Sequence, residues 1–303
     1  MSIVKAVVLG IVQGLTEFLP VSSSGHLVIA RSILHTQEAL LTFDTIVHVG
    51  TLLAVVVVFW GDIVEVLRAA LEMVTPGPGR NGRGYGKRSS GGRDRGGRGV
   101  RAVGVESRAA EANRQLFWLI IVGTIPAAVM GIALEGIFKA LFESTASVAA
   151  FLILTGILLW LAERLKREDV PVARFSLLRG LLVGIAQGCA IAPGLSRSGS
   201  TISAALLLGL PRDEAARYSF LLSIPVILGA AVLQLKDILA AGAGFDGLAL
   251  PLIVGLVASA VSGYLAIRIF LSVVRRGRLT IFSYYCWAVG LMVLVAHLIL
   301  GWI

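Results

Sequence analysis

The fold is decided by GIVQGLTEFLPVSSSGHL, residues 10–27, and by its second copy, GIAQGCAIAPGLSRSGST, residues 184–201. Counted from Gln13 and from Gln187, each copy has Gly at the next position, Ser at the ninth and eleventh, and Gly at the twelfth. A Pro ends the apolar part of each copy, and a turn rich in hydroxyl side chains and Gly follows. Membrane proteins place irregular backbone at depth only where it lines a cavity or a site. The repeat therefore indicates two broken helices at a shared site.

The composition places the chain among membrane proteins. Hydrophobic residues make up 56% of the chain and charged residues 15%, whereas about 25% of a typical soluble domain is charged. Long apolar runs, such as residues 46–60 and 281–303, approach or exceed the roughly 20 residues that a helical span requires. Aromatic residues near the ends of such runs, including Trp60 and Tyr285, indicate anchors at the membrane interface. We expect one integral-membrane domain over residues 1–303.

The net charge of +9 does not indicate a nucleic-acid-binding protein. Most of the excess lies between Pro76 and Arg114, in a Gly- and Arg-rich stretch of low complexity. Such a stretch is typical of a flexible loop, and we expect this loop over residues 75–112 on the cytoplasmic side. The expected partners are therefore membrane lipids and no nucleic acid.

The apolar segments and their breaks predict an all-α polytopic membrane protein with about six transmembrane helices and two re-entrant helix–turn–helix pairs. The expected pairs are residues 2–18 with 26–35 and residues 175–192 with 199–210. The expected spans are residues 44–72, 115–136, 146–165, 215–236, 248–274 and 280–303. The second member of each pair is short for a span; the alternative is that each pair is two ordinary spans.

Charge bias predicts how these segments are oriented. If both short pairs are re-entrant, most of the 27 Lys and Arg residues fall on one side, which the positive-inside rule assigns to the cytoplasm. Both termini then face outward, the first pair enters from outside, and the second pair enters from the cytoplasm. The two copies therefore form an inverted-topology repeat. The polar turns of the two copies, called the first tip and the second tip below, meet near the midplane, where such repeats usually place a binding site.

The first tip carries groups suited to acid–base chemistry. Glu17 follows Gln13 by one helical turn and shares its helix face, and a carboxylate inside a membrane segment is a functional candidate by default. Ser23 is a candidate nucleophile, and His26 is a candidate general base. The alternatives are a Glu17 that only pairs with a cation and a His26 that only caps a helix.

The second tip is predicted to bind an anion. Arg197 has a planar guanidinium whose donors suit a phosphate, and the flanking Gly residues let backbone N–H groups approach the same anion. A helix beginning near Ser200 would direct its N-terminus there as well; the alternative is an Arg197 that only bridges helices. The candidate diphosphate-binding residues of the two tips are Ser22, Ser24, Gly194, Ser196, Arg197, Ser198, Gly199 and Thr201.

Together the tips offer the parts that phosphoryl transfer needs. The charge of the phosphate must be neutralised, and a nucleophile and a base must be positioned. Glu17 is also the candidate ligand of a hard divalent cation, Mg²⁺ or Ca²⁺, that bridges two phosphates. His48 shares a helix face with Asp44 and Thr51 and is a supporting residue of the same cavity or, alternatively, a buried His with its own partners.

At these residues the chain resembles the bacterial undecaprenyl-diphosphate phosphatase family, the BacA-type enzymes associated with bacitracin resistance. The positions that match the family's motifs are Gln13, Glu17, Pro20 through His26, the stretch FDTIVHVGTLLAVVVVFW from Phe43, and Pro193 through Thr201. The resemblance covers essentially the whole chain outside the loop at residues 75–112.

The resemblance implies an integral-membrane phosphatase that removes the terminal phosphate of undecaprenyl diphosphate and yields the carrier lipid for peptidoglycan synthesis. It also implies dependence on a divalent cation. Together with the predicted topology, it indicates the bacterial cytoplasmic (inner) membrane, with the active site facing the periplasm. The functional residues that it carries over are Glu17, Ser23, His26, Ser196, Arg197 and Thr201. Since Gln13 is not ionisable, any role that needs a carboxylate there falls to Glu17.

In the predicted mechanism the second tip holds the diphosphate, a cation near Glu17 offsets its charge, and Ser23 or a water attacks the terminal phosphorus with His26 as base. The sequence leaves the nucleophile open among Ser23, His26 and water. The rival class is an inverted-repeat transporter or flippase for a polyprenyl phosphate, and a third is a scaffold whose basic loop binds anionic lipid. The oligomeric state is open between a monomer and a homodimer.

Overall fold

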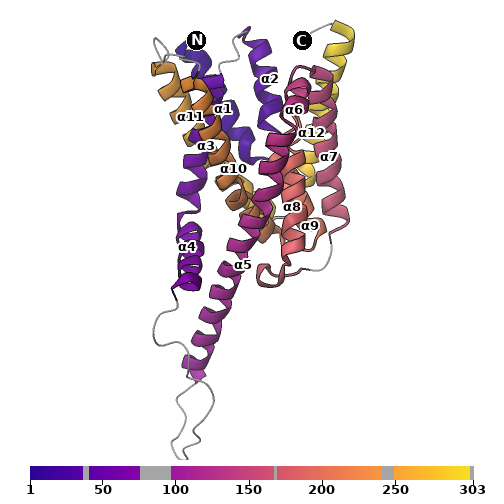
Figure 1. Cartoon of the computed structure of the whole chain (residues 1–303). Helices are drawn as coiled ribbons and strands as arrows, with labels where there is room; N and C mark the ends of the chain where they lie inside the picture. The colour runs from indigo at the N-terminus through magenta and orange to yellow at the C-terminus, as the bar shows by residue number, and fades with distance from the viewer. Residues whose placement is uncertain (37–40, 76–96, 167–168, 241–248, 301–303) are drawn as a thin grey trace, which may run out of the picture.

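The computed structural model describes residues 1–36, 41–75, 97–166, 169–240 and 249–300, and this part of the chain is all-helical (Figure 1). Its elements are α1 (Ile3–Phe18), α2 (Ser23–Ile33), α3 (Leu41–Val58), α4 (Trp60–Val74), α5 (Gly97–Ala133), α6 (Glu135–Phe142), α7 (Thr145–Arg164), the 3-10 turn η1 (Val172–Arg174), α8 (Leu177–Cys189), α9 (Arg197–Leu207), α10 (Arg212–Ala240), α11 (Ala249–Arg275) and α12 (Thr280–Leu300). Among the described residues, five helices are long and apolar enough to cross a membrane, and the bent pair α3–α4 makes a sixth candidate span. The predicted all-α polytopic fold is confirmed.

The long helices present large apolar side chains outward. Ile132 is 71% exposed, Val257 is 51% exposed and Leu298 is 73% exposed. Exposed apolar surface on this scale is unusual on a soluble monomer, but it is the ordinary lipid-facing surface of a membrane helix. The chain is therefore a multi-pass membrane protein.

Two helical hairpins turn back inside the fold from opposite ends (Figure 1). The α1–α2 hairpin enters from the end where α1 begins and α12 finishes, and the α8–α9 hairpin enters from the other end. α2 and α9 have 11 residues each, which at the rise of an α-helix corresponds to roughly 17 Å, about half of a bilayer's hydrocarbon core. These are re-entrant pairs of opposite orientation, as the repeat predicts.

Both short helices begin earlier than the sequence pattern suggests. α2 begins at Ser23 and α9 begins at Arg197, whereas the predicted starts are residues 26 and 199. The physical reason is the residue before each helix, because Ser22 and Ser196 are N-caps. Ser23 and Arg197 are therefore the first residues of helices rather than members of the turns.

The span predicted at residues 44–72 is wrong in one respect, because the helix breaks and α4 leaves α3 at an angle of 76°. α4 carries charged residues that bind polar partners on other helices. Arg217 Nε lies 2.5 Å from the carboxylate of Asp62, and Asn113 donates to Glu65 at 3.1 Å. Ionised side chains at this density are too costly to continue through hydrocarbon, so the helix turns where they can be paired.

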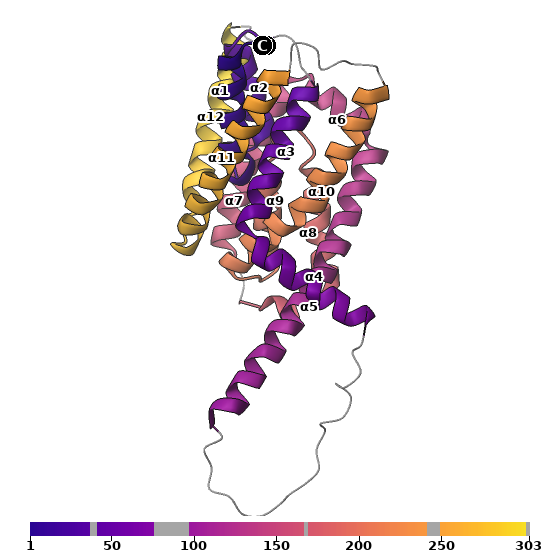
Figure 2. The same cartoon turned by 90° about the vertical axis from the view of Figure 1, so that its left-hand side faces the viewer.

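The loop predicted at residues 75–112 is wrong over its last part. Residues 76–96 lie outside the described part of the chain, and α5 already begins at Gly97. The segment RAAEANRQ at residues 108–115 consists largely of strong helix formers, so it continues the spanning helix without a break. Figure 2 shows this first part of α5 extending beyond the helical bundle.

Glycines at equivalent places in the two repeats let each broken helix pack closely on a span. Gly10 of α1 faces α11, where an added Cβ would lie 2.6 Å from the carbonyl oxygen of Gly255. At its counterpart in α8, Gly184, an added Cβ would lie 2.4 Å from the carbonyl oxygen of Gly123 in α5. Membrane helices commonly approach each other through such small residues. Gly10 and Gly184, three positions before the repeated Gln, thus allow α1 and α8 to pack closely on the spanning helices.

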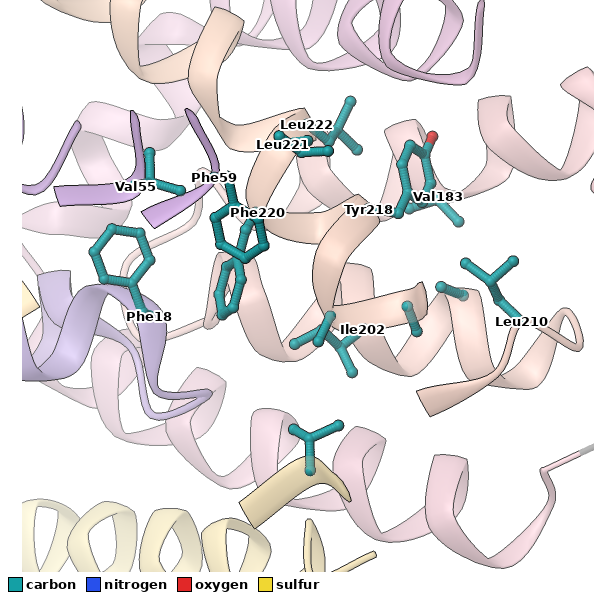
Figure 3. Close-up of a cluster of buried hydrophobic side chains, with 14 of the residues drawn as sticks. Phe18, Val55, Phe59, Val183, Ile202, Leu210, Tyr218, Phe220, Leu221 and Leu222 are labelled. Carbon is teal, nitrogen blue, oxygen red and sulfur yellow. The ribbon is translucent and has the colours of Figure 1, made fainter. Parts of the chain in front are cut away.

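Aromatic side chains form the part of the core next to the first tip (Figure 3). Phe18, the last residue of α1, packs edge-on against Phe220 of α10, with ring centroids 5.6 Å apart. Phe220 also contacts Phe59 at 5.6 Å and Phe270 at 5.7 Å. Because pairs of this kind add about 0.5–1.5 kcal/mol each beyond their area burial, they fix the end of α1 and with it the neighbouring carboxylate of Glu17.

Candidate active site

The Ser and Gly residues shared by the two copies cap the helices that begin at the tips. The hydroxyl of Ser22 accepts the backbone N–H of Gly25 at 3.3 Å, and that of Ser196 accepts the N–H of Gly199 at 3.1 Å. A capping Ser satisfies one of the free donors in the first helical turn. The ninth and twelfth positions of the repeat are therefore explained by the geometry of a helix start.

The two tips are bonded to each other through the Ser at the eleventh position of each repeat. Ser24 accepts the backbone N–H of Gly194 at 3.3 Å, and Ser198 donates to the carbonyl oxygen of Leu19 at 3.1 Å. Each Ser thus binds the turn backbone of the other repeat. The tips converge, which is the arrangement that the inverted repeat predicts.

The carboxylate of Glu17 lies where the tips meet and is buried. Its Oε1 accepts a hydrogen bond from Arg197 Nη2 at 2.8 Å. Its Oε2 accepts the hydroxyl of Ser23 at 2.6 Å and the amide Nε2 of Gln13 at 3.0 Å. One carboxylate from the first repeat therefore gathers a hydroxyl, an amide and the guanidinium of the second repeat.

Arg197 is held in place but keeps donors to spare. Its Nη1 donates to the carbonyl oxygen of Ser219 at 3.5 Å, in addition to the bond from Nη2 to Glu17. A guanidinium has five N–H donors, so further donors are available to an anion. Thr201 lies one turn further along α9 and bonds both the Arg197 carbonyl oxygen, at 2.8 Å, and the hydroxyl of Ser219, at 2.6 Å.

The two histidines near the site are held in the same way but differ in what their second ring nitrogen meets. His26 Nδ1 bonds the Ser22 carbonyl oxygen at 2.8 Å, and His48 Nδ1 bonds the Asp44 carbonyl oxygen at 2.7 Å. His48 Nε2 lies 3.9 Å from Glu17 Oε2. His26 Nε2 instead bonds the hydroxyl of Tyr285 on α12. The structure thus places His48 beside the carboxylate, and it places the hydroxyl of Ser23 against Glu17.

Comparison with known proteins assigns the chain to a family. A family model described as bacitracin resistance protein BacA matches residues 6–292. The chain belongs to the BacA family. Proteins named undecaprenyl-diphosphatase from Halothermothrix orenii and Carboxydothermus hydrogenoformans are each 41% identical to it, over 97% and 96% of this chain and 98% and 96% of theirs. A protein of the same name from Methanosphaera stadtmanae is 39% identical over 99% of this chain and all of its own length.

The predicted diphosphate-binding residues of this BacA family member are placed around the junction of the tips. In the structure their hydroxyl and backbone groups form the helix caps and the bonds between the tips. The residues concerned are Ser22, Ser24, Gly194, Ser196, Ser198 and Gly199. Their role in binding a phosphate stays a prediction, as does that of Thr201, whose side chain is fully buried.

Three residues at the site were not found from the sequence. Thr155 of α7 accepts the backbone N–H of Ser196 at 3.0 Å and donates to the Gly194 carbonyl oxygen at 3.2 Å, so it shapes the second tip. Ser219 holds Arg197. Tyr285, which the sequence suggests as an interface anchor, contacts His26 instead. Thr155 and Ser219 are hydroxyl side chains inside apolar spans, and this pattern could have indicated them from the sequence.

The divalent cation that the sequence resemblance implies stays a prediction, and it would find two oxygen groups at this junction. The described residues contain no group of three or more His, Cys, Asp or Glu side chains that could hold a metal ion on their own. However, Gln13 Oε1 is buried and has no hydrogen-bond partner in the part of the chain that the structure describes, and Gln13 is bonded to Glu17. Carboxylate and amide oxygens are hard ligands, and Mg²⁺ commonly takes its remaining ligands from substrate phosphates and water. The donor set therefore fits such a cation.

Proposed function

We propose that this chain hydrolyses undecaprenyl diphosphate to undecaprenyl phosphate and phosphate, and so returns the carrier lipid to peptidoglycan synthesis. Relatives that match nearly its whole length carry the name undecaprenyl-diphosphatase. The observation that carries the proposal is the meeting of Ser23 and Arg197 on the carboxylate of Glu17. A nucleophile in contact with a base, beside an anion-binding side chain, is the arrangement that phosphoryl transfer requires.

The diphosphate would bind where two helices begin. α2 and α9 both start at the tips, and a helix N-terminus offers free N–H groups and a partial positive charge to an anion. Arg197 adds a full positive charge and the donors that Glu17 and Ser219 leave free. The two repeats thus contribute one helix start each, and the second repeat contributes the guanidinium.

The reaction follows from the bond between Ser23 and Glu17. Glu17 accepts the hydroxyl proton as Ser23 Oγ attacks the terminal phosphorus. The bond from that phosphorus to the bridging oxygen breaks, and the bridging oxygen leaves with undecaprenyl phosphate. Water then hydrolyses the phosphoserine and releases phosphate, which regenerates the hydroxyl of Ser23. This assignment makes Glu17 the base for Ser23 and leaves His26 to act as a base on the water that hydrolyses the phosphoserine.

A divalent cation, Mg²⁺ or Ca²⁺, would be held by Glu17 and Gln13 together with oxygens of the diphosphate. When bound, it would supply positive charge that offsets the negative charge of the two phosphates. The lipid tail would lie along the exposed apolar faces of the spanning helices.

The proposed orientation is supported by where the basic residues lie. α7 ends at Arg164, α10 begins at Arg212 and α11 ends at Arg275, all at the end opposite the chain termini. The positive-inside rule assigns such an end to the cytoplasm. The α1–α2 hairpin then enters from the periplasmic side of the bacterial inner membrane, and the site would receive its substrate from that side.

The test is phosphate release from a prenyl diphosphate by the purified protein in detergent. Glu17→Ala and Arg197→Ala are compared with the wild type, and Glu143→Ala and Arg278→Ala serve as matched controls because both residues are exposed. We expect the two site variants to lose activity and the two controls to retain it. Equal phosphate release by the wild type and both site variants would exclude the proposal.

The inverted hairpins also favour a second candidate, a transporter or flippase for a polyprenyl phosphate, since broken helices of opposite orientation are typical of alternating access. Transport alone does not require a hydroxyl bonded to a carboxylate. Translocation of a labelled polyprenyl phosphate in liposomes, measured for the Ser23→Ala variant, separates the two activities. A flippase would keep its rate in that variant, whereas a phosphatase would stop releasing phosphate.

A further inference from the structure

His26 is fixed on two sides by groups that are far apart in the sequence. Its Nδ1 lies 2.8 Å from the carbonyl oxygen of Ser22, in the turn before it, and its Nε2 lies 2.8 Å from the hydroxyl of Tyr285 on α12. The two aromatic rings are also stacked, with centroids 5.6 Å apart and planes 9° from parallel. Tyr285 therefore holds both the plane and one nitrogen of the imidazole.

The partners of the two nitrogens determine the tautomer. A carbonyl oxygen can only accept a hydrogen bond, so Nδ1 must carry the proton that it shares with Ser22. In the neutral imidazole the lone pair is then on Nε2, which accepts the hydroxyl proton of Tyr285. A protonated ring would instead donate from Nε2 to the hydroxyl oxygen, so it is in the neutral ring that this contact places the basic nitrogen at Nε2.

The position of Tyr285 is itself fixed by its neighbours. Cys286 is fully buried and its thiol lies 3.5 Å from the carbonyl oxygen of Pro20, in the turn of the first tip. Trp287 donates its indole N–H to the carbonyl oxygen of Ile153 on α7 at 3.2 Å. Three consecutive residues of α12 thus contact the first tip or the helix beside it. The hydroxyl of Tyr285 is held where it meets His26.

The contact lies at an exposed edge of the first tip. Tyr285 is 43% exposed, and His26 is one helical turn after Ser23 on the same face of α2. A substrate that reaches the hydroxyl of Ser23 therefore comes close to the imidazole. Holding that ring in one orientation and one tautomer avoids an ordering step when the lipid binds.

We propose that Tyr285 is a positioning residue that presents His26 to the reaction as a neutral imidazole with its lone pair on Nε2. The proposal rests on the proposed phosphatase function and adds a residue of α12 to the site formed by the two tips. Tyr285 acts through the imidazole of His26 rather than on the substrate.

The first experiment compares Tyr285→Phe with Tyr284→Phe in the phosphate-release assay. The Tyr285 variant keeps the stacked ring and loses only the hydroxyl. Tyr284 is the matched control, because it is exposed and its ring packs on Trp287 at 5.7 Å. We expect kcat of Tyr285→Phe to fall by about tenfold, the effect of one lost hydrogen bond, with KM changed less than about twofold. Wild-type kcat in Tyr285→Phe would overturn the proposal.

The second experiment observes His26 without depending on activity. The chain has four histidines, so ¹⁵N-histidine-labelled protein in detergent gives few ring signals, and a His26→Asn variant identifies those of His26. We expect wild-type signals of a neutral ring protonated on Nδ1, a shift of the Nε2 signal in Tyr285→Phe, and none in Tyr284→Phe. An unchanged His26 signal in Tyr285→Phe would overturn the proposal. If the wild type releases no phosphate, the proposed function fails, and the ring signals still show separately whether Tyr285 holds His26.

Discussion

Ser23 and Arg197 occupy the same position of the two repeats, the first residue of the second hairpin helix, and both donate to the carboxylate of Glu17. Equivalent places in an ancestral symmetric fold have therefore acquired different chemistry. The first repeat supplies a hydroxyl and the second supplies a permanent positive charge. Glu17 has no carboxylate counterpart, because Ile191 stands at its place in the second copy.

Replacing Glu17 with Gln tests the carboxylate without changing its size. We expect kcat to fall about 10²–10⁴-fold, the usual effect of losing a general base. We also expect lower thermal stability, because Arg197 loses its partner, and breaking a buried pair costs about 3–5 kcal/mol. Phosphate release and a melting curve in detergent measure the two effects. Glu143→Gln is the control, and wild-type activity in Glu17→Gln would contradict the assignment.

Replacing Ser23 with Ala tests the nucleophile. If Ser23 attacks phosphorus, kcat should fall by at least about 10³-fold, as expected when a nucleophile is lost. The exposed Ser272 gives the control variant Ser272→Ala. An Ser23→Ala enzyme within about tenfold of the wild type would assign the attack to water instead.

The bonds between the tips predict a stability effect that can be separated from catalysis. Ser24→Ala and Ser198→Ala each remove one hydrogen bond between the repeats, at a cost of about 1 kcal/mol. We expect each variant to melt at a lower temperature, with KM for the prenyl diphosphate changed less than about threefold. A large rise in KM at unchanged stability would instead show that these hydroxyls bind the diphosphate, as the sequence suggests.

Gly10 predicts how tightly α1 packs on α11. A Cβ at this position would lie 2.6 Å from a backbone oxygen, so Gly10→Ala should destabilise the protein by about 1–3 kcal/mol. Gly61 of α4 has no atom within 4 Å of an added Cβ. Gly61→Ala should therefore be neutral or stabilising by up to about 1 kcal/mol. Equal melting temperatures for the two variants would contradict this account of the packing.

Removal of divalent cations tests the proposed role of Glu17 and Gln13 as ligands. We expect a chelator to abolish phosphate release and Mg²⁺ or Ca²⁺ to restore it. Gln13→Ala should require a higher cation concentration for half-maximal activity, because it removes the amide oxygen. Full activity after exhaustive chelation would exclude the cation from the reaction.

The sequence alone predicted the hairpins, their opposite orientation and the tip residues, because a polar break inside an apolar segment has few structural explanations. It did not predict the bend between α3 and α4, because that bend depends on partners such as Arg217 that lie far along the chain. It also suggested that Tyr285 is an interface anchor, since an aromatic residue near a span end is typical of one. The contact of Tyr285 with His26 depends on how α12 packs on the first tip, which the sequence does not show. The pairing of Ser23 with Glu17 rather than with His26 depends on side-chain directions at the start of α2.

The ion pair between Glu17 and Arg197 has a consequence for biosynthesis. The two residues are 180 positions apart, so Glu17 is synthesised long before Arg197. A carboxylate at depth without a cation is unfavourable, so we expect the first hairpin to reach its final depth only after α9 has been inserted. A nascent chain that stops before Arg197 should leave that hairpin accessible to protease from outside. The ion pair would then form only when insertion is complete.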